Sequence, residues 1–88
     1  MPRPTRCRRI CKEPLYDSFV PENGCEDRSA VELSVDEFET IRLIDLDKYT
    51  HEQCAEQMDI SRTTVTELYE SARFKLADSF INGKRLVI

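Results

Sequence analysis

The sequence has no tryptophan, one histidine and only two glycines in 88 residues. Bulky packing must therefore come from its four Phe and three Tyr residues. It also lacks any apolar run of the roughly 20 residues that span a bilayer, and no apolar segment follows its charged N-terminus as in a signal peptide. These absences predict one small cytoplasmic domain with no membrane contact, in which cysteines stay reduced.

Signatures of catalysis are missing as well. The chain has no Gly-rich phosphate loop and no nucleophile and base at the spacing of a known enzyme family. The acidic residues Asp36, Glu37 and Glu39 are expected at the start and on the surface of a helix, rather than as a buried catalytic pair. We therefore predict that the protein is not an enzyme.

Positive charge is scarce overall, since the net charge is −4, but it is unevenly distributed. Residues 1–12 contain five basic residues and no acid, residues 13–59 are strongly acidic, and residues 60–88 are again weakly basic. Because phosphate binding depends on local positive potential, a chain of this kind can still present a basic face to nucleic acid.

The first third of the chain predicts an irregular arm at residues 1–29. It contains all four prolines and the turn-forming sequence "PENG", and both features disfavour helix. Residues 30–35 alternate apolar and polar side chains and predict a short strand or an extended lead-in to the helix that follows. A capping box of Ser34 and Glu37 then predicts a helix at 35–47.

Two further helices follow within the domain expected at residues 30–88. Thr50 and Gln53 form a second capping box, which predicts a helix at 50–58. The next helix is expected at 62–81, with Ser61 as its N-cap and Gly83 at its end. Its buried stripe is predicted from side chains three or four residues apart, which are Val65, Leu68, Ala72, Leu76 and Phe80.

The C-terminal residues 84–88 are apolar and β-prone, and pairing them with 30–34 gives a two-stranded ribbon. The predicted fold is thus mainly α: a three-helix helix-turn-helix domain with a minor two-stranded β ribbon and an irregular N-terminal arm.

The segment "CAEQMDISRTTV" fits the steric needs of a helix-turn-helix. Ala55 is small where the helices would cross, Asp59 accepts the left-handed turn, and Ile60 fills the space between the helices. A plain helical hairpin with a solvated polar face is the alternative. Glu67 and Glu70 lie on the same exposed face and oppose phosphate binding.

The predicted DNA-binding residues are Ser61, Arg62, Thr63 and Thr66 in the groove, Arg73 at the DNA backbone, and Arg3, Arg6, Arg8 and Arg9 in the arm.

The blocks "RRICKEP", "FVPENG", "LSVDEFETIRLIDLD", "CAEQMDISRTTV" and "ESARFKLADSFINGKRLVI" resemble a widespread prokaryotic family along the whole chain. Its members are short, largely uncharacterised, predicted DNA-binding proteins with a helix-turn-helix similar to region four of sigma factors. The resemblance implies a sigma-region-four-like domain that regulates transcription. A basic residue commonly stands in that family where this chain has Glu67.

The four cysteines allow two interpretations. Cys7, Cys11, Cys25 and Cys54 could together bind zinc or an iron–sulfur cluster and clamp the arm onto the helices. Alternatively, Cys54 is a small core residue and the other three are free thiols, which the non-standard C-x3-C spacing favours. His51 is expected to face solvent.

The sequence therefore predicts a sequence-specific regulator that binds double-stranded DNA, as a homodimer because one recognition helix gives limited affinity. Two other functions stay open. The protein could be a sigma-like protein-interaction module whose acidic surface docks a basic partner. It could also be a metal- or redox-responsive sensor that works through its cysteines.

Overall fold

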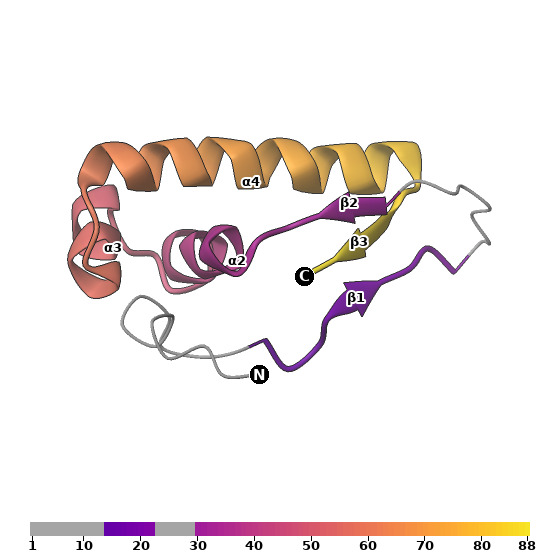
Figure 1. Ribbon diagram of the computed structural model, residues 1–88, viewed down its shortest axis with the longest axis horizontal. Coiled ribbons are helices and arrows are strands. Elements are labelled where there is room, and N and C mark those ends of the chain that lie inside the picture. The colour runs from indigo at the N-terminus through magenta and orange to yellow at the C-terminus, as the bar shows by residue number, and fades with distance from the viewer. Residues whose placement is uncertain (1–13, 23–29) are drawn as a thin grey trace.

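The computed structural model describes residues 14–22 and 30–88. Figure 1 shows a long helix, α4 (Arg62–Asn82), along one side of the molecule. Helix α3 (His51–Met58) lies at its N-terminal end, and the strands lie beneath its C-terminal half. Between them lies α2 (Val35–Ile41), which continues into η1, a π-helical turn at Arg42–Leu46. The described part is mainly helical, as predicted.

The helices begin where the sequence places their caps. Ser34 caps α2 and Thr50 caps α3, each in a reciprocal capping box. Ser61 caps α4, and its hydroxyl accepts a hydrogen bond from the Thr64 N–H at 3.1 Å. At the far end, Gly83 ends α4 with a left-handed φ of 68°, which only glycine adopts without steric cost. The structure thus confirms these predicted helix ends. They could be predicted from the sequence because each end depends on residues within one helical turn.

The first predicted helix is not uniform. The expected helix at 35–47 is α-helical only to Ile41, after which η1 widens the turn and the Asp47 N–H donates to the Arg42 carbonyl at 3.0 Å. Lys48 then takes a left-handed φ of 64°, which turns the chain toward α3. Single π-helical turns of this kind are rare and are often found at functional sites, and this one contains Asp45.

The sheet has three strands rather than the two expected. β2 (Ala30–Glu32) and β3 (Arg85–Val87) pair in parallel, which confirms the pairing of 30–34 with 84–88. A third strand, β1 (Ser18–Phe19), pairs antiparallel with the other edge of β3. It belongs to the segment predicted as an irregular arm. The prediction was wrong there because two paired residues between prolines leave no periodicity to detect.

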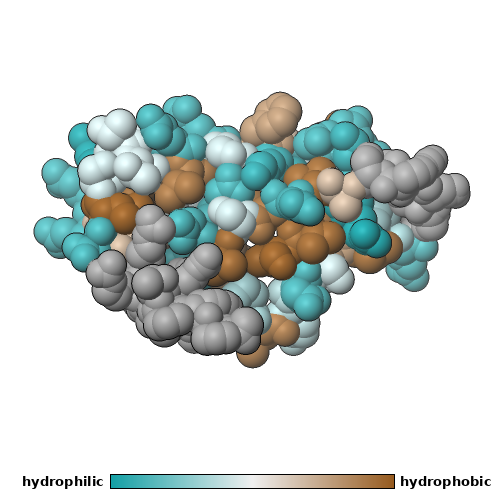
Figure 2. All heavy atoms as spheres, in the orientation of Figure 1, coloured by the Kyte–Doolittle hydropathy of each residue, from teal (hydrophilic) through white to brown (hydrophobic). Residues whose placement is uncertain are grey.

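Two buried clusters hold the helices. The first contains Leu43, Cys54, Ala55, Met58 and Val65 and joins η1, α3 and the start of α4. The second contains Val31, Leu33, Ala72 and Leu86 and joins the sheet to the middle of α4. On the face drawn in Figure 2, hydrophobic atoms gather in the middle of the molecule, beneath α4.

Two burial predictions were wrong. Phe80 is 73% exposed, although its spacing placed it in the buried stripe of α4. Glu39, expected on a helix surface, is fully buried, and Glu37 is 5% exposed. Glu39 is tolerated inside because Arg42, one turn later, approaches it with two nitrogens at 2.7 and 3.1 Å. Such a fork neutralises a buried carboxylate.

Candidate nucleic-acid interface

Helices α3 and α4 meet through a short turn with a fixed geometry. Asp59 has φ 63° and ψ 47°, the left-handed conformation predicted for it. The Ile60 N–H donates to the Ala55 carbonyl at 3.1 Å, and the Ile60 side chain packs against the first cluster. Ala55 and Val65 are buried where the helices pack together. The two helices are therefore held rigidly, with the first turn of α4 at one end of the molecule (Figure 1).

The four predicted groove residues differ in their exposure and in their contacts within the protein. Arg62 and Thr63 are exposed at the start of α4, as expected. Ser61 is exposed too, but its hydroxyl already bonds the Thr64 N–H and the Thr64 hydroxyl, the latter at 2.9 Å. Arg62 and Thr63 are thus the predicted side chains best placed to contact a ligand in front of this helix end.

Thr66 lies in a contact that the sequence did not reveal. It is half-buried, and its hydroxyl lies 3.0 Å from Nδ1 of His51. The His51 ring also meets Tyr69 edge-on, with ring centroids 5.3 Å apart. The expectation that His51 faces solvent was therefore wrong. Because His51 and Thr66 are 15 residues apart, no local pattern could have paired them.

Arg73 also has partners within the protein. Its Nη1 lies 3.3 Å from Oδ2 of Asp45, and its guanidinium lies over the Tyr69 ring at 5.3 Å. The Tyr69 hydroxyl donates to Asp45 at 2.7 Å, and this hydrogen bond, together with burial, raises the pKa of Tyr69. Arg73 keeps 56% side-chain exposure, so it could still reach a phosphate while it stays beside Asp45. The π-helical turn η1 supplies Asp45 to this cluster.

The surroundings of the turn are acidic. An open hollow of roughly 730 Å³ lies beside it, lined by Glu52, Ala55, Glu56, Asp59, Ile60 and Ser61. Glu67 and Glu70 are exposed further along α4. Carboxylates repel phosphate, so the described part of this surface would bind DNA only weakly by charge alone. Glu67 and Glu70 were predicted from the sequence to oppose phosphate binding, whereas the positions of Glu52 and Glu56 beside the turn were not predicted.

The middle of α4 is fixed by a buried carboxylate on α2. Glu37 accepts a hydrogen bond from Ser71 at 2.5 Å and lies 2.9 Å from Nζ of Lys75. Burial works to raise the pKa of Glu37, but the hydrogen bonds from Ser71 and the Ser34 backbone and the nearby Lys75 charge outweigh it and lower the pKa. Lys75 is therefore committed to the scaffold and contributes less to any phosphate contact.

Cys54 is placed as a core residue. It has no exposed surface, and its thiol lies 3.7 Å from the Met58 sulfur. Burial and the charge of Glu39 raise the pKa of Cys54 to about 11, which keeps the thiol protonated at neutral pH. The complete burial of Cys54 beside Met58 favours its interpretation as a small core residue.

Several predicted residues lie outside the described ranges. These are the remaining proposed metal ligands Cys7, Cys11 and Cys25, and the arm residues Arg3, Arg6, Arg8 and Arg9. Within residues 14–22 and 30–88, no three His, Cys, Asp or Glu side chains are grouped so that they could hold a metal ion. Over the same ranges, none of the helices has the length and apolar character needed to cross a membrane.

Comparison with known proteins gives family membership but no function. A UPF0251 protein of Desulfitobacterium hafniense (strain Y51) is 48% identical over 89 residues, which cover 100% of this chain and 71% of the relative. A UPF0251 protein of Caldicellulosiruptor bescii is 46% identical over 88 residues, which cover 100% of this chain but only 61% of the relative. No solved structure matches the chain. The family model described as "Protein of unknown function DUF134" matches residues 1–88, and the chain therefore belongs to this family of uncharacterised prokaryotic proteins.

Proposed function

We propose that this protein binds double-stranded DNA sequence-specifically and regulates transcription, with α3 and α4 acting as a sigma-region-four-like helix-turn-helix. The observation that carries the proposal is the rigid turn at Asp59–Ser61, which leaves Arg62 and Thr63 exposed on the first turn of a well-anchored helix. A recognition helix needs this combination, because its first turns must enter the major groove without losing their anchor.

Arg62 is assigned the base-reading role and Thr63 a phosphate or thymine-methyl contact. An arginine can donate two hydrogen bonds to a guanine edge, the commonest specific contact in protein–DNA complexes. Thr66 acts indirectly, since its hydroxyl is held by His51. Affinity must come largely from positive charge elsewhere, and the acid-free residues 1–12 are the chain's densest source of it. A cytoplasmic location and the absence of catalysis follow from this role and stay predictions.

Two duplex-binding measurements test the proposal. Anisotropy with a labelled random duplex at about 50 mM salt should give measurable binding that weakens steeply as salt rises. After selection of a preferred duplex, Arg62→Ala should lose about 1–3 kcal/mol of binding free energy on that sequence. It should also remove the preference for one base over the others at one base pair. Arg85→Ala is the matched control, because Arg85 is also an exposed arginine but lies on β3, at the other end of α4.

The outcomes separate the possible roles. If wild type shows no affinity for duplex at about 50 mM salt, where the electrostatic attraction is strong, DNA binding is wrong. If binding occurs but Arg62→Ala keeps the full base preference, another residue reads the sequence.

A second candidate function is supported by one specific observation. The hollow beside the turn is rimmed by Glu52, Glu56 and Asp59, and Glu67 extends the acidic surface along α4. Such a surface suits a basic protein partner better than a phosphate backbone. Glu67→Lys distinguishes the two functions, because it should tighten binding to random duplex if α4 faces DNA and leave it unchanged if that face binds protein.

A further inference from the structure

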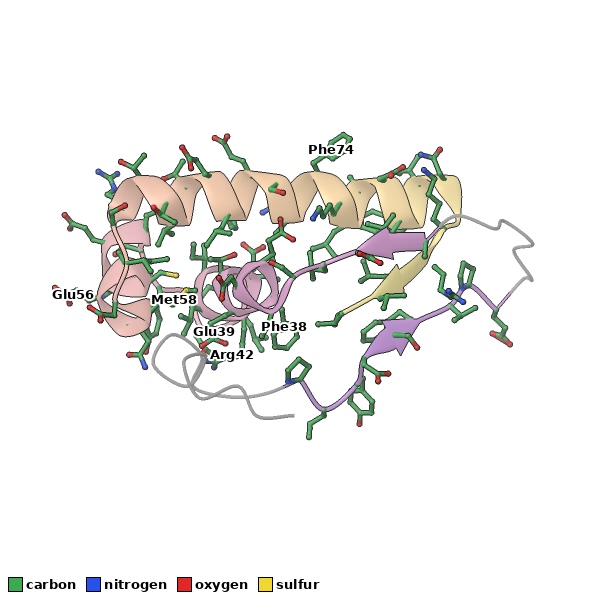
Figure 3. The ribbon with its side chains drawn as sticks, in the orientation of Figure 1. Phe38, Glu39, Arg42, Glu56, Met58 and Phe74 are labelled. Atoms are coloured by element: carbon green, nitrogen blue, oxygen red, sulfur yellow. The ribbon has the colours of Figure 1, made fainter. Side chains whose placement is uncertain are left out.

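The C-terminal half of α4 presents an apolar surface that no described element covers. Phe74, Phe80 and Ile81 are 71–73% exposed, and Ala77 between them is exposed as well. Figure 3 shows Phe74 projecting from the side of α4 that faces away from the strands and the other helices. We call these four residues the outer patch. Patches of this kind on small proteins are frequently functional.

The outer patch is arranged symmetrically about one residue. Phe74 and Phe80 lie three positions on either side of Ala77, and Arg73 and Ile81 lie four positions on either side. With 3.6 residues per turn, these side chains all fall within roughly 60° of Ala77 around the helix. Such an arrangement is self-complementary, because a two-fold axis at Ala77 brings Phe74 of one copy to Ile81 of the other on one flank, and Arg73 to Phe80 on the other flank.

We infer that the outer patch binds a second copy of this chain, with the two α4 helices antiparallel and crossing at Ala77. Ala77 is small enough for the helix axes to approach closely, and Phe74 of one copy packs beside Ile81 of the other, because both lie on the same flank of the contact. On the other flank, the aliphatic part of Arg73 lies beside Phe80 of the second copy, as long charged side chains commonly do.

Charge complementarity supports a second copy as the occupant. Glu70 lies seven positions before Ala77, so in the antiparallel pair it comes to the level of the end of α4 in the second copy, where Lys84 follows Gly83 and can approach it. Lys84 lies just beyond the end of α4, and its Nζ is 3.2 Å from Oδ2 of Asp78. A parallel arrangement would instead place Glu70 against Glu70, which is unfavourable. The antiparallel register is therefore the one that the charges favour.

The size of the patch sets the strength of the pairing. Three large side chains with about 70% exposure bury on the order of 400 Å² per copy, roughly half of the ~800 Å² per partner found in standard interfaces. The dimer should therefore be weak and depend on protein concentration. Thr63 lies 14 residues from Ala77, about 21 Å along the helix, so the pairing leaves the first turn of α4 uncovered.

Sedimentation equilibrium on the 88-residue chain tests this inference. Wild type should change from monomer to dimer between about 10 μM and about 1 mM, the range in which an interface of this size dissociates. Phe74→Glu should weaken dimerisation at least about tenfold, because a charge replaces an aromatic side chain in the contact. Leu46→Glu is the matched control, since Leu46 is 72% exposed on η1 and should leave dimerisation unchanged.

Two more variants make the register testable. Ala77→Glu places two carboxylates on the two-fold axis and should give a monomer, with helix content unchanged by circular dichroism. Glu70→Lys should weaken the dimer roughly threefold to tenfold at low salt, and less at high salt.

The inference does not rest on DNA binding, and its failure leaves that proposal untouched. A wild type that is monomeric up to about 1 mM would overturn it. A dimer dissociated by Leu46→Glu but by neither Phe74→Glu nor Ala77→Glu would move the interface to α2 and η1, and would also overturn it.

Discussion

The two ends of α4 are anchored in different ways. Its N-terminal end packs against η1 and α3 through Leu43, Met58 and Val65, which are at most 1% exposed. Its middle and C-terminal part pack on a three-stranded sheet through Val31, Leu33 and Leu86, which keep 4–8% exposure, and the only fully buried member of this second cluster is the small Ala72. The end proposed to read DNA is thus the more completely packed one.

The two ends of α4 also differ on the outer face of the helix, which is polar near the N-terminal end and apolar near the C-terminal end. Near the well-packed end it carries Arg62, Thr63, Glu67 and Glu70, which are hydrated and leave the surface free for a polar ligand. Near the less packed end it carries the outer patch, which gains by being covered. One helix therefore has a rigid polar end suited to recognition and an apolar end suited to association.

A matched pair of leucine truncations should give the largest effect. Leu43→Ala should lower the free energy of unfolding by about 3–5 kcal/mol, because Leu43 is 1% exposed inside the first cluster and leaves a cavity. Leu86→Ala, in the strand at the other end, should cost about 2–3 kcal/mol, because a short strand can adjust around the lost volume. Urea denaturation measures both, and an equal or larger loss for Leu86→Ala would contradict the difference in packing.

Alkaline pH should lower the free energy of unfolding through Cys54, which belongs to the cluster at the N-terminal end of α4. Since its pKa is raised to about 11 from 9.0, the thiol stays protonated in the folded protein while the unfolded chain ionises. The contribution of the protonated Cys54 thiol to the free energy of unfolding is therefore complete below pH 9 and is lost as pH rises through about 11. The expected change is roughly 2 kcal/mol. The measurement compares the unfolding free energy of wild type and Cys54→Ala from about pH 8 to about pH 10.5, and wild type should fall more steeply. Parallel curves would mean that the thiol reaches solvent in the folded state.

Acid should act on the contact between α2 and the middle of α4. The pKa of Glu37 is lowered from 4.5 in the folded protein, so its contribution is present above that pH and lost as pH falls through the lower folded value. Glu37→Gln should cost about 1–2 kcal/mol at neutral pH, because it weakens the bonds to Lys75 and Ser71, and the cost should shrink toward about pH 3.

The control for this acid effect is Glu56→Gln. Glu56 is exposed and projects away from the rest of the molecule (Figure 3), so its replacement should change stability little at either pH. A cost for Glu37→Gln that did not vary with pH would show that shape, rather than charge, makes Glu37 important.

The sequence predicted the features that local chemistry determines. Each helix start was found because a Ser or Thr must accept a backbone N–H two or three residues later. The left-handed residues Asp59 and Gly83 were found because few residue types tolerate that conformation. The pairing of β2 with β3 followed from two short apolar segments that flank the helices.

Prediction from the sequence was wrong where the position of a side chain or strand depends on residues far away in the chain. Steps of four residues rotate by about 40° around a helix, so the series Leu68, Ala72, Leu76, Phe80 drifts out of the buried face, and Phe80 ends exposed. The His51–Thr66 contact and β1 depend on tertiary approach. The burial of Glu39 did have a signal, since Arg42 stands one turn later, but that spacing is equally common on helix surfaces.

The smallest predicted effect compares the left-handed residues at the two ends of α4. Gly83 has φ 68° and open space where a Cβ would lie, so Gly83→Ala should cost about 1 kcal/mol purely from backbone conformation. Asp59 already has a similar φ, 63°, with a side chain, so Asp59→Gly should be neutral or stabilise by up to about 0.5 kcal/mol. Thermal unfolding measures both. If Asp59→Gly instead destabilised the protein as much as Gly83→Ala, the Asp59 carboxylate would have to stabilise the turn by interactions beyond its backbone conformation.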